Sequence, residues 1–403
     1  MTTKQVLLAF LCLVYVVVTP ICAHAKTASI DVSAESAILY SPDIKEALFK
    51  KNAQHRMPMA STTKVMTALA VLDACKNLES VFTIPKEACG IEGSSLYLVE
   101  GETLTIKELL EALLLRSAND AAVALAIAID QNIEKFCDRM NRMAEEMGLL
   151  DTHFSNPHGL DAAEHYTTAY DLARITEKAM EHPVFRSIVA SKKAKISGPD
   201  NAVRIVANHN KLLWLYDDAI GVKTGFTKKS GRCLVGAADR DGVLLITVTL
   251  NAPNDWQDHQ NMFEYGFSQL TSPLFAKSGE LSFEAPVVGG AQSTILLTNQ
   301  DAMKGTIKTH GEAPTFKIEY NRPITAPVKQ GEVMGKVYVL QSSHVVAESP
   351  LVAKTAVSSI KTRKKWLWQK KSDCKSFYPM PAFYPEEPLK QKSQKAQLPS
   401  TDM

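Results

Sequence analysis

Long apolar runs predict a core of buried helices in the first half of the chain. Runs that are apolar on nearly every side follow Lys64, Leu109 and Ala121, and such runs are typical of helices inside a domain rather than on its surface. Residues 134–149 read as an amphipathic helix, and Thr168–Met180 is predicted to form another helix. The first half is therefore mainly helical.

The apolar period changes to two at Ala219, which predicts strands. Polar turns containing glycine separate three such segments, and the spacing predicts an antiparallel meander closed by a helix over 256–270. The predicted strands are Ala219–Phe226, Cys233–Ala238 and Val243–Leu250. A further strand pair is predicted near the start, at Ala28–Val32 and Ala37–Tyr40.

The C-terminal third is different in pattern. From Phe275 the strand-like segments are short and the turns are rich in Gly and Pro, which predicts a small all-β domain over 275–352. Residues 353–403 form a tail that mixes basic residues with Trp366 and Trp368. That mixture favours association with an anionic membrane surface, the alternative being a solvated basic tail, and the last residues are expected to be partly disordered.

Residues 1–25 have the pattern of a secretory signal peptide. Lys4 precedes an apolar run from Val6 to Val18, and Ala23-His24-Ala25 is a small-x-small cleavage site. The run is short for a membrane anchor, and the residues before Cys22 resemble a lipobox poorly. We therefore expect an exported, extracytoplasmic protein of the cell envelope whose first domain spans 26–274.

Composition excludes some functions. Lys plus Arg number 45 against 43 for Asp plus Glu in 403 residues, which gives no argument for nucleic acid binding. The cysteines after the signal peptide lack the spacing of a zinc site or a disulfide framework, although a Cys75–Cys89 bridge stays open. Neither His158 nor His165 has ligand-type spacing, so no metal or organic cofactor is expected.

The strongest local chemistry is at the start of the first buried helix. Ser61 and Lys64 are one helical turn apart and face the same way. A lysine in an apolar setting loses its proton near neutral pH, and the helix start favours negative charge on the serine. Taken alone, the pair is better explained as a helix cap followed by a surface lysine.

Two further polar groups follow in order. Ser117 and Asn119 lie in a tight turn between two buried helices, after a Thr105–Glu108 capping box, and Lys223-Thr224-Gly225 lies on a predicted strand. The three groups are the Ser-x-x-Lys, Ser-x-Asn and Lys-Thr-Gly motifs of the penicillin-recognising serine enzymes. Among these, the chain resembles the low-molecular-mass penicillin-binding proteins that are D-alanyl-D-alanine carboxypeptidases, over roughly residues 28–352.

This resemblance implies an α+β fold of the β-lactamase/transpeptidase type, an antiparallel sheet flanked by helices, followed by the small all-β domain. It implies an active site between the helix carrying Ser61 and an edge strand carrying Lys223. The implied reaction removes the terminal D-alanine of peptidoglycan stem peptides, and β-lactam antibiotics are the implied inhibitors. The family usually ends in a longer amphipathic anchoring helix than this tail offers, so the resemblance leaves peripheral attachment to the outer face of the cytoplasmic membrane open.

The resemblance also implies roles for eight residues. Ser61, Lys64 and Ser117 are implied to be catalytic, as nucleophile, base and proton relay. The other five are implied to bind substrate, with the N–H groups of Ser61 and Phe226 as the oxyanion hole. These five are Asn119, Lys223, Thr224, Gly225 and Phe226.

Two other functions share parts of this pattern. A class A β-lactamase has all three motifs, but it needs a Glu-x-x-Leu-Asn segment, and the nearest match, Glu146–Leu150, lacks the asparagine. Without that segment, this chain is expected to deacylate slowly after its reaction with penicillin. Class A β-lactamases also lack the extra β domain. A non-catalytic cell-wall-binding protein is the other alternative, and the intact motif set argues against it.

Overall fold

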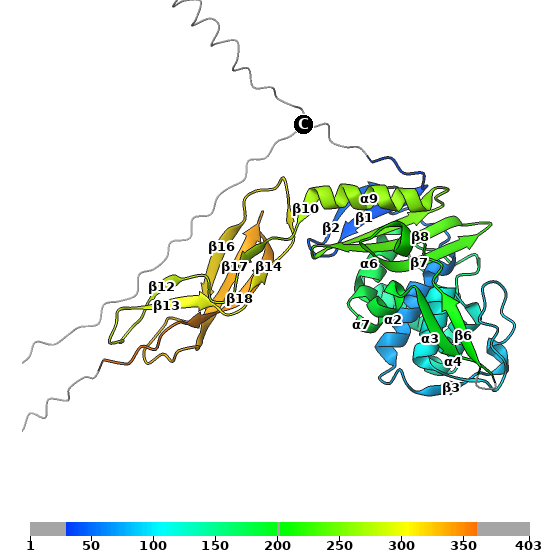
Figure 1. The fold of residues 1–403 in the computed structure, drawn as a ribbon, viewed down its shortest axis with the longest axis horizontal. Helices are drawn as coiled ribbons and strands as arrows, with labels where there is room; N and C mark the ends of the chain where they lie inside the picture. Colours follow the sequence, from blue (N-terminus) through cyan, green and yellow to red (C-terminus); the bar gives the residue numbers. More distant parts are fainter. Residues whose placement is uncertain (1–29, 200–201, 361–403) are drawn as a thin grey trace, which may run out of the picture. The chain divides into compact units, whose positions relative to one another are not determined.

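The computed structural model describes residues 30–199 and 202–360. The first domain is built on a five-stranded antiparallel sheet with the order β2-β1-β9-β8-β7, and helices cover both faces (Figure 1). Its strands are β1 (Ser36–Ser41), β2 (Glu46–Lys51), β7 (Ala219–Thr227), β8 (Gly231–Arg240) and β9 (Val243–Leu250). The predicted meander from Ala219 is confirmed, and β7 lies at the sheet edge.

Alternating side chains of the strands pack into two separate hydrophobic cores. On β1, Ile38 packs with the helical side of the domain, whereas Leu39 packs with α9 (Asp255–Gln269) on the opposite face. Both are fully buried, which is the expected result when a strand of period two is covered on both sides. Burial of a large side chain such as Phe263 of α9 contributes roughly 2 kcal/mol.

The helical side is built around α2 (Lys64–Ala74), whose residues Lys64–Val71 are all buried. This confirms the prediction of an internal helix, which is preceded by a single 3-10 turn, η1 (Ala60–Thr63). The Thr105–Glu108 capping box is also confirmed. The other helical elements are η2 (Lys86–Ala88), α3 (Ile106–Glu111), the π-type turn η3 (Ala112–Arg116), α4 (Asn119–Asp130), α5 (Ile133–Glu146), α6 (Ala169–Met180), α7 (Pro183–Ala190) and α8 (Leu212–Leu215).

The first strand pair was predicted wrongly. Residues 30–32 are not in a strand, and β1 pairs instead with β2, which follows it after a turn containing Lys45 at φ 54°. The sequence pattern Glu46–Lys51 is charged at both ends and half-buried, so it lacks the apolar alternation that identified the other strands.

Two small hairpins complete this domain. One joins β3 (Val81–Thr83) to β4 (Thr103–Thr105). The other joins β5 (Lys193–Ser197) to β6 (Val203–Ala207) and, like α7, was not predicted. The two strands expose most of their residues, so hydrophobic alternation gives little sign of them.

The C-terminal domain is all-β, as predicted. Its main sheet has the order β12-β13-β18-β17-β16, and a core that includes Leu297, Val337, Val339 and Leu351 lies against it. Its strands are β10 (Leu270–Thr271), β11 (Leu274–Ala276), β12 (Phe283–Pro286), β13 (Thr294–Asn299), β14 (Met303–Lys304), β15 (Ile307–Lys308), β16 (Thr315–Tyr320), β17 (Val333–Gln341) and β18 (His344–Ala353).

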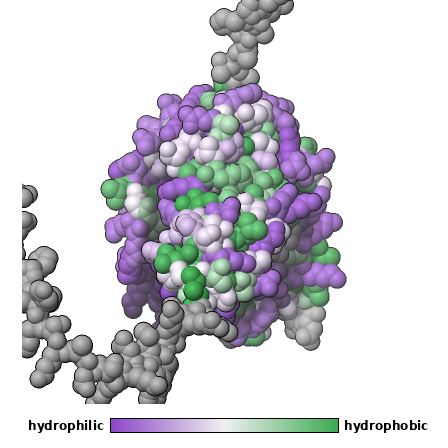
Figure 2. Space-filling model, turned by 90° about the vertical axis from the view of Figure 1, so that its left-hand side faces the viewer, coloured by the Kyte–Doolittle hydropathy of each residue, from purple (hydrophilic) through white to green (hydrophobic). Residues whose placement is uncertain are grey.

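Figure 2 shows apolar residues scattered among hydrophilic ones on the face that it draws. Several large apolar side chains of the C-terminal domain are exposed, and scattered residues of this kind are ordinary for a protein surface. They include Val288, Leu296, Phe316, Tyr320, Val333 and Val345.

The predicted signal peptide, residues 1–25, and most of the predicted tail, residues 361–403, lie outside the described residues. Within residues 30–199 and 202–360, no helix is both long and apolar enough to cross a membrane. Four cysteines fall in this part of the chain, Cys75, Cys89, Cys137 and Cys233, and all four are free thiols, so a Cys75–Cys89 bridge is absent.

Candidate active site

Ser61 is held in a tight turn immediately before α2. Ala60 has a φ of 47°, a conformation that costs energy for a residue other than glycine. Side-chain hydrogen bonds hold this turn, from Thr62 Oγ1 to the Met59 carbonyl at 2.6 Å and from Thr63 Oγ1 to the Ala60 carbonyl at 2.8 Å. Ser61 is partly exposed while the next nine residues are buried, so its hydroxyl is presented at the surface of the site.

His165 supports the same turn. Because the Ser155 N–H donates to His165 Nδ1 at 3.1 Å, the ring proton lies on Nε2, which donates to Thr63 Oγ1 at 2.8 Å. Burial lowers the pKa of His165 to about 3, so the ring is neutral at pH 7. No sequence pattern indicates this contact, because 102 residues separate the two side chains.

Lys64 is fully buried and points back toward Ser61. Its Nζ lies 2.8 Å from Ser61 Oγ, 2.7 Å from Asn119 Oδ1 and 2.6 Å from the His158 carbonyl oxygen. Burial holds the pKa of Lys64 well below its ordinary value, and the nearby positive charge of Lys223 lowers it further. A neutral amine has two N–H donors and one lone pair, so at 2.8 Å the Ser61 hydroxyl can donate to Lys64 Nζ.

Gly159 allows the loop carrying His158 to lie against the nucleophile turn. Its φ is +92°, and a Cβ atom there would lie 2.0 Å from the Ala60 carbonyl oxygen. The Pro157 carbonyl also accepts from Thr67 Oγ1 of α2 at 2.6 Å. The backbone of this loop supplies one of the three partners of Lys64.

Ser117 and Asn119 form the opposite wall. Ser117 adopts a left-handed conformation, with φ 63°, between η3 and α4. Asn119 directs Oδ1 to Lys64, while its Nδ2 donates to the Glu92 carbonyl at 2.5 Å. The Ser117 hydroxyl has no hydrogen bond to another described residue, so the structure brings it to the site without linking it to Lys64.

The third wall is the edge strand β7. Lys223 is 1 % exposed, donates to the Thr224 carbonyl at 2.9 Å, and has a pKa that burial lowers to about 7. At Gly225 a Cβ atom would lie 3.1 Å from the Ser61 nitrogen and 3.0 Å from the Met59 carbonyl oxygen. A residue without a side chain therefore lets the strand approach the nucleophile, and Phe226 next to it is 66 % exposed.

All eight predicted site residues thus lie on three elements that meet around Ser61: the start of α2, the turn before α4, and β7. No group of three or more His, Cys, Asp or Glu side chains in the described ranges is arranged to hold a metal ion. The groups that could do chemistry here are two serine hydroxyls, two buried amines and backbone amides. This set suits acyl transfer through a serine.

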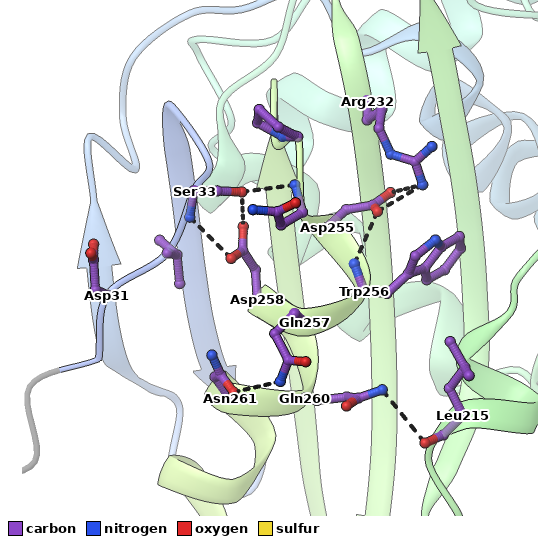
Figure 3. A pocket seen from close by; sticks show the side chains of 13 residues that line it. Asp31, Ser33, Leu215, Arg232, Asp255, Trp256, Gln257, Asp258, Gln260 and Asn261 are labelled. Carbon is purple, nitrogen blue, oxygen red and sulfur yellow. Dashed lines mark hydrogen bonds and ion pairs between the residues drawn. The ribbon is translucent and has the colours of Figure 1, made fainter.

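A large hollow in the surface lies elsewhere. It has a volume of about 1060 Å³ and is lined by residues at the start of α9 and by Arg232 of β8, none of which belongs to the predicted site (Figure 3). Three of its four charged side chains already have partners: Arg232 contacts both Asp255 oxygens at 2.7 and 2.9 Å, and Asp258 accepts from Ser33. Size alone therefore does not identify the reactive site.

Comparisons with known proteins agree with this geometry. A family model described as D-alanyl-D-alanine carboxypeptidase matches residues 22–254, and one described as penicillin-binding protein 5, C-terminal domain, matches residues 271–359. The chain is 30 % identical to D-alanyl-D-alanine carboxypeptidase DacF of Bacillus subtilis, over 82 % of this chain and 87 % of that protein. It is 29 % identical to DacC of Escherichia coli, over 83 % and 86 %.

Solved structures give the same answer for the fold. Penicillin-binding protein 5 of Haemophilus influenzae aligns with a TM-score of 0.62 and 26 % identity, covering 82 % of this chain and 99 % of that one. A Streptococcus pneumoniae protein described as a peptidoglycan synthesis regulatory factor aligns with a TM-score of 0.70 at 23 % identity, covering 82 % and 100 %. The second match supports the fold alone.

Proposed function

Because the chain belongs to the D-alanyl-D-alanine carboxypeptidase family, and is therefore a serine-type carboxypeptidase with a penicillin-binding fold, we propose that Ser61 is its nucleophile and Lys64 its general base. The observation that carries this assignment is the 2.8 Å contact between Ser61 Oγ and the buried Lys64 Nζ. A lysine that is neutral near pH 7 can take the hydroxyl proton as the serine attacks.

The first step forms an acyl-enzyme. Ser61 Oγ attacks the carbonyl carbon of the penultimate D-alanine, and its proton passes to Lys64 Nζ. The carbonyl electron pair moves onto oxygen, where the backbone N–H groups of Ser61 and Phe226 stabilise the negative charge. The close approach of Gly225 to the Ser61 nitrogen supports this pairing of donors from two elements.

The terminal D-alanine then leaves. We assign the Ser117 hydroxyl to give its proton to the departing amine while it recovers a proton from Lys64. The carbonyl re-forms, the C–N bond breaks, and D-alanine is released. The free hydroxyl of Ser117 and its place beside Asn119 support this role, which requires a small movement that brings Ser117 into contact with Lys64.

Substrate binding follows from the same walls. We assign Lys223 and Thr224 to the terminal carboxylate, because a buried cation without an acidic partner in the described chain suits an anion. Asn119 would hold the substrate amide as well as Lys64. Gly225 lets the peptide lie along β7, whose outer edge has no neighbouring strand in the sheet.

The second step is hydrolysis of the ester by water. Proteins of this family act on peptidoglycan stem peptides and bind β-lactams. In a β-lactam the leaving nitrogen stays tethered to the acyl group, and this chain lacks the Glu-x-x-Leu-Asn segment that speeds deacylation in class A β-lactamases. The penicilloyl-enzyme should therefore persist.

The place of action is the cell wall, outside the cytoplasm, as for the relatives. For this chain, export through residues 1–25 and attachment of residues 353–403 to anionic lipid are proposals that rest on the sequence. Salt-sensitive binding of a 353–403 peptide to vesicles with and without phosphatidylglycerol tests the attachment. Equal binding to both vesicles would exclude it.

Intact-protein mass spectrometry after incubation with benzylpenicillin tests the nucleophile. One penicilloyl adduct is expected, on the peptide that contains Ser61, and none in S61A. S117A serves as the matched control, because it keeps the nucleophile and should still react slowly. An adduct on S61A, or no adduct on the unaltered protein, would contradict the assignment of Ser61 as the nucleophile.

A further inference from the structure

Asp120 is a buried carboxylate that the steps above do not use. It follows Asn119 in α4 and is 0 % exposed. It accepts hydrogen bonds from Ser95 Oγ at 2.6 Å, from the Leu96 N–H at 3.1 Å and from the Leu98 N–H at 3.0 Å. None of the ion pairs among the described residues includes it, so its direct contacts are hydrogen bonds.

The segment that Asp120 holds also holds Asn119. The Glu92 carbonyl accepts from Asn119 Nδ2 at 2.5 Å, and the Ser94 carbonyl accepts from the Asn119 N–H at 2.7 Å. Gly93 lies so close that a Cβ atom there would be 2.7 Å from Asn119 Nδ2. Asp120 is therefore connected through residues 92–98 to the amide whose oxygen contacts Lys64 Nζ.

Asp120 is also a negative charge near Lys64. The groups that face Lys64 are Lys223 on β7, His158 and His165 on the loop beside α2, and Asp120 on α4. Burial lowers the pKa of His158 to about 4 and that of His165 to about 3, so both are neutral at pH 7. Lys223 lowers the pKa of Lys64 and Asp120 raises it.

We propose that Asp120 is a positioning residue that holds Asn119 against Lys64 through residues 92–98 and supplies the counter-charge of Lys64. This rests on the base role proposed above for Lys64. A carboxylate is suited to both tasks, because it accepts several N–H and O–H bonds at once and carries the charge that an amide lacks.

Asp258 offers a matched control. It is also a buried aspartate, 4 % exposed, and it accepts from a backbone N–H and a hydroxyl, both of Ser33, at 3.0 and 2.7 Å (Figure 3). It lies at the start of α9, away from the site residues. D120N and D258N therefore remove the same charge from similar surroundings, and only D120N removes it next to Asn119 and Lys64.

The experiment measures kcat and KM for D-alanine release from a defined pentapeptide between pH 5 and 10, together with thermal unfolding. D120N is expected to lower kcat/KM roughly tenfold or more, since a buried charged acceptor is lost. Because the negative charge raises the pKa of Lys64, its removal should also shift the acid limb of kcat/KM to lower pH, by roughly half a unit or more. D258N should lose stability while its acid limb stays in place.

S95A separates the two tasks, because it keeps the charge and removes the hydrogen bond from Ser95 Oγ to Asp120, together with the one that Ser95 Oγ accepts from the Tyr97 N–H. It is expected to lower kcat/KM roughly two- to fivefold with no shift of the acid limb. An acid limb in D120N that coincides with that of D258N overturns the counter-charge, and a wild-type kcat/KM in D120N or in S95A overturns the positioning role. If D120N is recovered unfolded, the kcat/KM of S95A alone tests the positioning role. A missing penicillin adduct on Ser61 in the unaltered protein contradicts the base assignment instead, so the two failures are distinguishable.

Discussion

Two basic side chains on neighbouring strands differ in whether they have an acidic partner. Arg232 of β8 contacts both oxygens of the buried Asp255 and lies over the Trp256 ring, 5.6 Å from its centre. Lys223 of β7 is buried as deeply as a core residue and has no acidic partner in the described chain. A paired cation stabilises a fold, whereas a buried unpaired one costs stability and is retained where it serves chemistry.

The same contrast applies to Lys64, whose three contacts are all to neutral oxygen atoms. Removal of a cation should therefore have opposite effects on stability in the two regions. At the active site it should abolish activity and raise the free energy of unfolding. At the start of α9 it should lower the free energy of unfolding.

The largest expected effect is on catalysis by K64M. Methionine fills the apolar channel but cannot accept the Ser61 proton, so kcat/KM for D-alanine release should fall about 10³-fold. Release of D-alanine from a pentapeptide measures this, with R232M as the comparison from the paired region. K64M activity within tenfold of the unaltered protein would rule out Lys64 as the base.

A smaller effect is expected on substrate recognition by K223M. Loss of the cation should lower kcat/KM roughly 10²-fold for a peptide that ends in a free carboxylate. For the same peptide with a C-terminal amide the loss should be much smaller, because no anion is left to bind. Equal losses of kcat/KM for both peptides would show that Lys223 does not bind the carboxylate.

The two regions should also differ in stability. The pKa of Lys223 is lowered from 10.5 to about 7, so between these values the unfolded chain binds a proton that the folded one does not. The free energy of unfolding therefore falls as pH decreases from 10.5 to 7, and the loss is complete below pH 7. K223M should raise the free energy of unfolding at pH 6 by on the order of a few kcal/mol, and the gain should vanish near pH 10.5.

R232M should do the reverse. Asp255 is 3 % exposed and would keep its charge without its partner, but Arg232 is itself partly exposed, so the loss is about 1–2 kcal/mol. Urea unfolding of both variants at pH 6 and pH 10 measures the comparison. Destabilisation by both changes at pH 6 would remove the distinction between the two regions.

Much of this site could be predicted from the sequence, because its chemistry is local. Ser61 and Lys64 are one turn apart, and the meander that carries Lys223 has a clear period of two. The same holds for the buried helices, whose apolar runs are continuous. Three short motifs in order were therefore enough to indicate both fold and reaction.

What the sequence did not reveal depends on contacts between distant segments. β1 pairs with β9 across more than 200 residues, and the partner of β1 on its other side, β2, has no apolar alternation. His165 contacts Thr63 across 102 residues, and Asp120 contacts Ser95 and Leu98 more than 20 residues before it, so no spacing rule connects either residue with its partners. An acid in the first turn of a helix is a frequent and purely structural arrangement, so the sequence position of Asp120 does not indicate these contacts.

The central claim is that a buried, neutral Lys64 activates Ser61, and the pH dependence of acylation tests it most directly. The second-order rate of benzylpenicillin adduct formation on Ser61, followed by intact mass from pH 5 to 10, should be bell-shaped. Its acid limb, which reports loss of the Lys64 proton, should lie well below 10.5, and its alkaline limb should follow loss of the Lys223 charge above about pH 7. A rate that rises steadily up to pH 10 would mean that the base has the ordinary pKa of a lysine, and it would contradict the account.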